Sequence, residues 1–191
     1  MEPLLVSTGI VALAEIGDKT QLLSLVLAAR FRKPVPIILG ILAATLLNHA
    51  FAGAVGAWVT HLLGKDTLRW ILGLSFLAMA AWIMVPDKLD DEQQAASHHG
   101  VFITTFIAFF LAEMGDKTQV ATVMLAARYA DFASVVIGTT LGMMIANVPA
   151  VLLGDKLLAR VPLKAVRMAA AAVVALLGVV MLAALWPQFV R

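Results

Sequence analysis

Six long apolar runs divide this sequence and leave few folds open to it. Each is about as long as the roughly 20 residues that a helix needs to cross a hydrocarbon core of about 30 Å. The runs are continuous, whereas the strands of a membrane barrel alternate apolar and polar residues over about ten positions. The sequence therefore predicts an all-α membrane protein with six transmembrane helices, at about residues 4–28, 35–62, 68–85, 101–127, 133–154 and 166–186.

Composition agrees with burial in lipid rather than in water. The residue types AVILMFWYC make up 62% of the 191 residues and charged residues only 14%, whereas soluble proteins are about 45–50% apolar with glycine included. A single soluble domain of this size cannot bury so much apolar surface. The net charge of +2 comes from scattered short clusters, so nothing indicates a nucleic-acid partner. The absence of cysteine excludes disulfides and thiolate metal sites.

The sequence repeats itself at an offset of 98 residues. Residues 13–31 and 111–129 are identical at 12 of 19 positions. We therefore predict two three-helix halves, residues 1–86 and 101–191, joined by a polar linker at 87–100. Because each half contains an odd number of spans, the second half must enter the membrane from the opposite side. Such inverted repeats are typical of secondary transporters, whose substrate site lies near the midplane where the halves meet.

Positive charge in the loops predicts the orientation. The N-terminus, Met1-Glu2-Pro3, lacks the basic region of a cleavable signal peptide, so we expect none. Placing the N-terminus outside leaves eight Lys and Arg residues on the inner side and four on the outer side. The positive-inside rule therefore places both termini outside and the 87–100 linker in the cytoplasm.

Charged residues inside two of the predicted spans indicate a functional site. A charge near the bilayer centre costs about 2.5–3.5 kcal/mol on insertion scales. An acid pair three residues apart shares one face of a helix, so the two antiparallel copies are expected to bring four carboxylates together. Gly17 and Gly115 allow close approach of a backbone or an ion, or a break in the helix. The six charged residues are Glu15, Asp18, Lys19, Glu113, Asp116 and Lys117.

The neighbouring polar groups favour a hard divalent cation. Thr20, Gln21, Thr118 and Gln119 follow the acids and add neutral oxygens. Oxygen ligands suit Ca²⁺, Mg²⁺ and Mn²⁺. Four carboxylates and two ammonium groups sum to −2, which one divalent cation or two protons would neutralise. We therefore hypothesise an exchanger, in which the lysines tether the carboxylates or replace the departing ion.

Other readings of these residues remain open at this stage. Glu15–Lys19 and Glu113–Lys117 could be i,i+4 ion pairs that hold a bundle together, although buried ion pairs stabilise poorly. Asn48, beside His49, and Asn147 lie at membrane depth and are expected either to make interhelical hydrogen bonds or to line the ion path. The linker run Asp87, Asp90, Asp91, Glu92, His98 and His99 is expected to be solvated, with metal capture as the alternative.

The two motifs, residues 15–20 and 113–118, resemble those of a small membrane family of cation/proton exchangers with a duplicated E-x-G-D-K-[TS] motif. Its eukaryotic members act on Mn²⁺ and Ca²⁺ in Golgi and chloroplast membranes, and its bacterial members include manganese exporters. The resemblance covers the whole chain in length, helix count and central loop. It implies that Glu15, Asp18, Glu113 and Asp116 bind the cation.

We therefore expect a multi-pass protein of the bacterial inner membrane that exports Mn²⁺ in exchange for protons. Its partners are the ion, protons and the lipid bilayer; no cofactor and no enzymatic activity are expected, and the oligomeric state is left open. A Ca²⁺/H⁺ exchanger is the alternative in the same class. An intramembrane enzyme whose carboxylate-held metal activates water, or a structural membrane subunit, are the alternatives from other classes.

Overall fold

The computed structural model describes residues 1–85, 100–153 and 163–184, and in this part of the chain the regular structure is entirely helical. The linker at 87–100 and its acidic and histidine residues therefore lie almost wholly outside the described residues. The helices are α1 (Glu2–Glu15), α2 (Lys19–Phe31), α3 (Pro34–Leu62), α4 (Lys65–Ile83), α5 (Val101–Glu113), α6 (Lys117–Tyr129), α7 (Phe132–Leu153) and α9 (Leu163–Ala183).

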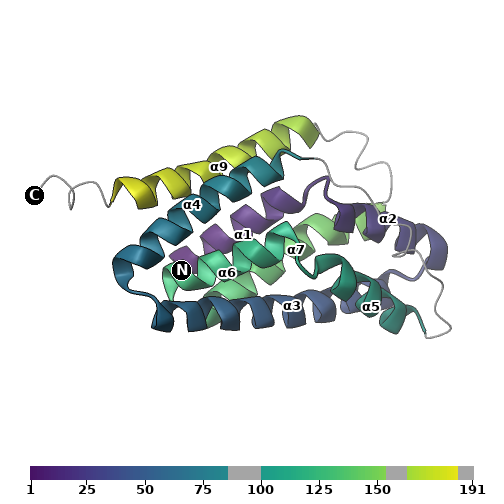
Figure 1. Cartoon of the computed structure of the whole chain (residues 1–191). Coiled ribbons are helices and arrows are strands. Elements are labelled where there is room, and N and C mark those ends of the chain that lie inside the picture. Colours follow the sequence, from purple (N-terminus) through teal and green to yellow (C-terminus); the bar gives the residue numbers. More distant parts are fainter. Residues whose placement is uncertain (86–99, 154–162, 185–191) are drawn as a thin grey trace, which may run out of the picture.

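Within the described ranges, four helices are each long and apolar enough to cross a membrane: Pro34–Leu62, Asp66–Ile83, Phe132–Leu153 and Lys164–Ala183. They coincide with four of the six predicted spans. The other two predicted spans, 4–28 and 101–127, are not continuous helices. Each is divided into a pair of short helices, α1 with α2 and α5 with α6, of 13 or 14 residues apiece (Figure 1).

Both breaks occur within the repeated motif and have the same backbone geometry. Gly17 and Gly115 have φ values of 81° and 78°, which glycine adopts without the steric cost that a Cβ would bring. Asp18 and Asp116 then cap the following helices with φ, ψ of −84°, 169° and −82°, 170°. The expectation that each acid pair shares one helical face is therefore wrong, because a helix ends before each aspartate and a new one begins after it.

Equivalent helices of the two repeats make equivalent contacts across the halves. α1 packs against α7 as α5 packs against α3, and α2 packs against α7 as α6 packs against α3. A Cβ added to Gly40 would lie 2.9 Å from the carbonyl oxygen of Phe102, and one added to Gly138 would lie 2.6 Å from that of Leu4. These pairs are related by the same offset of 98 residues. The halves therefore meet through matching faces.

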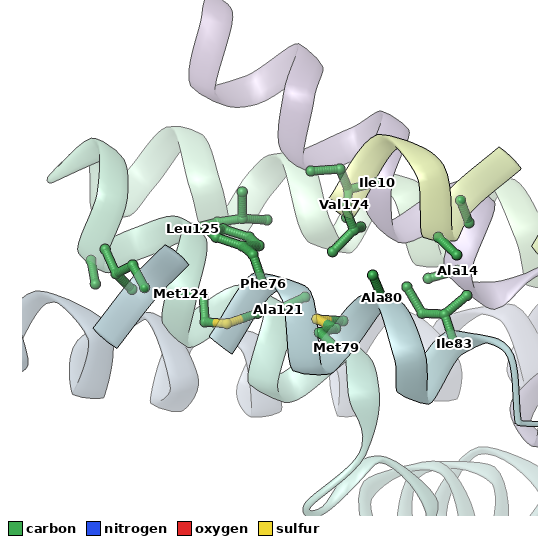
Figure 2. Close-up of a cluster of buried hydrophobic side chains, with 14 of the residues drawn as sticks. Ile10, Ala14, Phe76, Met79, Ala80, Ile83, Ala121, Met124, Leu125 and Val174 are labelled. Carbon is green, nitrogen blue, oxygen red and sulfur yellow. The ribbon is translucent and has the colours of Figure 1, made fainter. Parts of the chain in front are cut away.

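The helices of the third predicted span in each half, α4 and α9, pack along each other and cover α1 and α6 (Figure 1). Figure 2 shows the core that this arrangement creates, with Ile10 of α1, Phe76 of α4, Leu125 of α6 and Val174 of α9 meeting in one buried cluster. This core holds α1 and α6, and with them one side of each motif, in a fixed position.

Glycine contacts between the halves give a first prediction about stability. A Cβ at Gly56 of α3 would lie 2.3 Å from the carbonyl oxygen of Val123 in α6, whereas one at Gly9 of α1 would meet nothing within 4 Å. Alanine has a higher helix propensity than glycine, so propensity alone favours both substitutions. We expect Gly56→Ala to cost about 1–3 kcal/mol through overpacking and Gly9→Ala to be neutral. Thermal unfolding in detergent measures both variants. Equal unfolding midpoints for Gly56→Ala and Gly9→Ala would contradict the close approach of α3 to α6 at Gly56.

Candidate metal-binding site

The four motif carboxylates lie at the two helix breaks and are buried. Glu15 and Glu113 are the last residues of α1 and α5, while Asp18 and Asp116 are the N-caps of α2 and α6. Both glutamates are 0% exposed, and the aspartates are 4% and 3% exposed. Because one helix ends and the next begins within each motif, all four acids lie at the helix breaks, away from solvent.

Three of these carboxylates converge on one point. One oxygen from each of Glu15, Glu113 and Asp116 lies within 4.8 Å of the other two. A cation with metal–oxygen distances of about 2.1–2.6 Å separates its ligand oxygens by up to about 5 Å, so the spacing fits a single shared ion. Each of the three also has a buried oxygen with no hydrogen-bond partner among the described residues. Asp18 is not a member of this group of three.

The lysines pair across the halves. The Lys19 Nζ lies 3.2 Å from Asp116 Oδ1, and the Lys117 Nζ lies 3.2 Å from Asp18 Oδ1. Each lysine thus binds the aspartate of the other motif. The i,i+4 pairing of Glu15 with Lys19 and of Glu113 with Lys117 is not the arrangement found, because the helix break removes the geometry that such pairs need. The ion pairs therefore join the two motifs.

Threonine and glutamine hold the break in place in the same way in both copies. The Thr118 hydroxyl donates to Glu113 Oε2 at 2.7 Å, and the Thr20 hydroxyl donates to Glu15 Oε2. The Gly17 N–H donates to Gln21 Oε1 at 2.8 Å, and the Gly115 N–H donates to Gln119 Oε1 at 2.6 Å. The glutamine oxygens predicted as ion ligands are therefore occupied by the glycine backbone, and the threonines orient the glutamates.

The two copies differ in how they contact the long helices beside them. In the first, Gln21 Nε2 donates to the carbonyl oxygen of Ala146 at 2.9 Å and the Ser24 hydroxyl donates to Asn147 Oδ1 at 2.7 Å. We call this α2–α7 contact the latched interface. Asn147 therefore makes an interhelical hydrogen bond, one of its two predicted roles, and Ser24 is a partner that the sequence reading missed.

The equivalent α6–α3 contact lacks both bonds; we call it the open interface. Among the described residues, Gln119 donates no side-chain hydrogen bond to α3, and it lines a cavity of about 420 Å³ together with Leu47, Asn48, Phe51, Phe110 and Met114. Asn48 Nδ2 donates instead to the carbonyl oxygen of Phe110 at 3.1 Å, so it too makes an interhelical hydrogen bond. Gln21 of the first motif is thus bound to α7, whereas the equivalent residue of the second motif, Gln119, borders a cavity.

A second asymmetry concerns the ion pairs. Lys19 is 17% exposed and Lys117 is 4% exposed, and the Lys117 Nζ also lies 3.4 Å from the carbonyl oxygen of Val85 at the end of α4. His49, which occupies the position of Asn147 in the repeat, is fully buried. Neither of its ring nitrogens has a hydrogen-bond partner in the described chain. The shared sequence therefore builds two similar but unequal half-sites.

Comparison with known proteins agrees with these features. The family model described as "Divalent cation/proton antiporter GDT1" matches residues 3–91 and 101–188. A Vibrio cholerae protein named "Putative manganese exporter" is 56% identical over 168 residues, which is 87% of this chain and 84% of that protein. A Synechocystis GDT1-like protein, sll0615, is 28% identical over 82% of this chain and 85% of its own length.

A rice protein, GDT1-like protein 3 of Oryza sativa subsp. indica, is 26% identical over 84% of this chain and 66% of its own length. No solved structure gives a significant match. The family match covers nearly the whole chain and both copies of the motif, and the Vibrio protein supports it at high identity. The chain therefore belongs to the GDT1 family of divalent cation/proton antiporters.

Proposed function

We propose that this protein exports Mn²⁺ from the bacterial cytoplasm in exchange for protons, with the ion held between the two E-x-G-D-K-T motifs. The observation that carries the proposal is the buried oxygen cluster of Glu15, Glu113 and Asp116, to which both halves contribute. Three converging carboxylates without enough compensating donors would repel one another in a low-dielectric interior, so a bound cation or protons must neutralise them.

The charges of the site support an exchange of one load for the other. The four motif carboxylates and the two lysines sum to −2 when all are ionised. One divalent cation balances this charge, and so do two protons. The lysines already bind the Oδ1 atoms of both aspartates. They therefore keep the two motifs together while the divalent cation is exchanged for protons.

The choice of Mn²⁺ rests on the ligand type and on the relative at 56% identity that is named as a manganese exporter. Ca²⁺ accepts the same oxygen ligands, so a Ca²⁺/H⁺ exchanger is the competing assignment within the family. The unpartnered Oε1 atoms of Glu15 and Glu113 and Oδ2 of Asp116 are available to either ion. The selectivity must therefore be measured.

We further propose that the chain crosses the inner membrane six times as two inverted halves, 1–86 and 101–191, with both termini outside. The broken pairs α1–α2 and α5–α6 then count as one span each, with the ion at the break near the midplane, where unwound backbone is tolerated because it lines a site. The latched and open interfaces are the unequal states that alternating access needs, and each half adopts the other's arrangement when access changes sides.

Flux into proteoliposomes tests the proposed function directly. Purified protein is reconstituted, and uptake of Mn²⁺ and of Ca²⁺ is followed with an imposed pH gradient, with the gradient collapsed by a protonophore, and in protein-free vesicles. We expect Mn²⁺ to enter the lumen as protons leave it down the imposed gradient, so that the lumen becomes more alkaline in step with Mn²⁺ uptake. Ca²⁺ flux without Mn²⁺ flux would reassign the substrate, and flux of either ion that ignores the pH gradient would remove the proton coupling.

A further inference from the structure

The start of α4 and the ends of α6 and α9 lie at the same end of the bundle (Figure 1), and residues of these three helices line a basic cavity there. It has a volume of about 380 Å³ and is separate from the motif carboxylates. Its charged lining is supplied by two arginines, Arg69 of α4 and Arg128 of α6, and no acidic residue among those that the structure describes lines it. The other lining residues are Leu68, Leu72, Ala127, Tyr129, Val180, Met181 and Ala184.

The Arg128 guanidinium is held in position and retains an unused donor. Its Cζ lies 5.1 Å from the centre of the Tyr129 ring, a cation–π contact that fixes its direction. The Tyr129 hydroxyl in turn donates to Glu2 Oε1 at 3.3 Å, so that carboxylate is engaged beside the cavity. The Arg128 Nε is buried and has no hydrogen-bond partner among the described residues. A buried guanidinium donor without a partner normally belongs to a site for an acceptor.

Both arginines recur in the other half of the chain. The offset of 98 residues relates Arg128 to Arg30 and Arg69 to Arg167. The Arg30 guanidinium also lies over a ring, 5.3 Å from the centre of Phe31. Arg30 and Arg128 lie within the repeated segments 13–31 and 111–129, whereas Arg69 and Arg167 lie outside them, where few residues match between the halves.

The depth of the cavity identifies the chemistry of its ligand. Arg69 lies in the first turns of α4 and Arg128 in the last turn of α6, and in the six-span topology proposed above these helix ends meet the interface of the bilayer. The neighbouring Trp70 is 41% exposed, as expected in an interfacial aromatic belt. Guanidinium pairs bind phosphate oxygens through several charge-assisted hydrogen bonds. The apolar wall of Leu72, Val180 and Met181 continues from the arginines and suits an acyl chain.

We propose that this cavity binds the phosphate of an anionic phospholipid, with Arg69 and Arg128 on the headgroup and one acyl chain along the wall formed by α4 and α9. Free inorganic phosphate shares the same headgroup chemistry but leaves the apolar wall unused. The site does not involve the motif carboxylates, so it stands or falls independently of the transported ion. It would anchor α4 to α6 at the membrane surface.

Native mass spectrometry of the full chain in detergent tests this site. Phosphatidylglycerol, diacylglycerol with the same acyl chains, and inorganic phosphate are added separately. We expect retention of phosphatidylglycerol only. Since a hydrogen bond to a charged group contributes about 1.5–3 kcal/mol, the affinity should fall about tenfold or more in Arg69→Gln with Arg128→Gln. Arg128→Lys, which keeps the charge, should retain part of it.

The matched control is Arg30→Gln, which removes the equivalent ring-stacked arginine at the opposite end and should leave binding at this cavity unchanged. Arg69→Gln alone guards against misfolding, because Arg69 is exposed, and it should weaken phosphatidylglycerol by several-fold. Equal retention by wild type and both Arg69 variants would overturn the proposal. Retention of diacylglycerol equal to that of phosphatidylglycerol would contradict recognition of the phosphate. Binding of inorganic phosphate as tight as that of the lipid would contradict recognition of the acyl chain.

Discussion

Asp116→Asn abolishes Mn²⁺ export, by at least two orders of magnitude, while the protein inserts and purifies as wild type does; this is the result that we expect. The change keeps the volume of the side chain but removes one negative charge from the cluster that Asp116 forms with Glu15 and Glu113. The site then sums to −1 and no longer balances a divalent ion. Flux in proteoliposomes, with protein recovery after membrane extraction, measures both halves of this prediction.

A double variant separates an ion site from a structural ion pair. If Asp116 served only to neutralise a buried lysine, its loss would leave that charge unpaired at a cost of about 3–5 kcal/mol, and removal of the lysine would rescue the protein. The partner is Lys19 of the other motif, at 3.2 Å, and not the adjacent Lys117. We expect Asp116→Asn with Lys19→Met to remain inactive. Recovery of export in this variant would show that the carboxylate does not carry the ion.

A covalent bridge across the latched interface should stop transport completely. Ser24 Oγ and Asn147 Oδ1 are 2.7 Å apart, so cysteines at both positions, in a chain without other cysteines, are within reach of a short, reducible thiol cross-linker. If the latched and open interfaces must exchange during each cycle, the bridge holds the protein in one state. Flux should vanish on cross-linking and return on reduction.

The repeat supplies a matched pair for this experiment. Thr122 and His49 occupy the positions equivalent to Ser24 and Asn147 but form no hydrogen bond with each other in the described structure. Cysteines there should cross-link more slowly in resting protein and faster during turnover, because the open interface then closes. Full transport by the protein bridged at 24 and 147, or equal and constant cross-linking of both pairs, would contradict the exchange of interfaces.

Four of the six predicted spans coincide with helices that are long and apolar enough to cross a membrane, but the sequence could not describe the motif's geometry. Long apolar stretches flank the two motif segments, 15–21 and 113–119, and are compatible with an unbroken helix through each of them, since a glycine does not by itself require positive φ. The break is held by a local contact, in which the glutamine four residues on accepts from the glycine N–H, and by a tertiary contact, in which a lysine of the other motif binds the aspartate. Local spacing also left i,i+4 ion pairs open as an alternative, because such pairs assume an unbroken helix.

The convergence of the acids was predictable, whereas the inequality of the half-sites was not. A motif that is repeated in the chain indicates a shared site, and the structure brings three of the four predicted carboxylates together, Glu15, Glu113 and Asp116, but not Asp18. The latched interface depends on residues outside the motif, namely Ser24, Ala146 and Asn147. Both copies have a hydroxyl side chain three residues after the glutamine, at Ser24 and Thr122. This repeated hydroxyl is the feature of the sequence that could have identified Ser24.

The number of Mn²⁺ ions bound per chain tests the shared site most directly. Equilibrium dialysis of purified protein followed by metal analysis should give one Mn²⁺ per chain, and Glu15→Gln and Glu113→Gln should each remove all of it. Asp131→Asn is the matched control: this partly exposed carboxylate lies outside the site, and hydrogen bonds from the Ser134 side chain and backbone hold its pKa below the usual value, so an ionised acid is lost there too. Two Mn²⁺ per chain, with one retained in each glutamate variant, would contradict a single site built by both motifs.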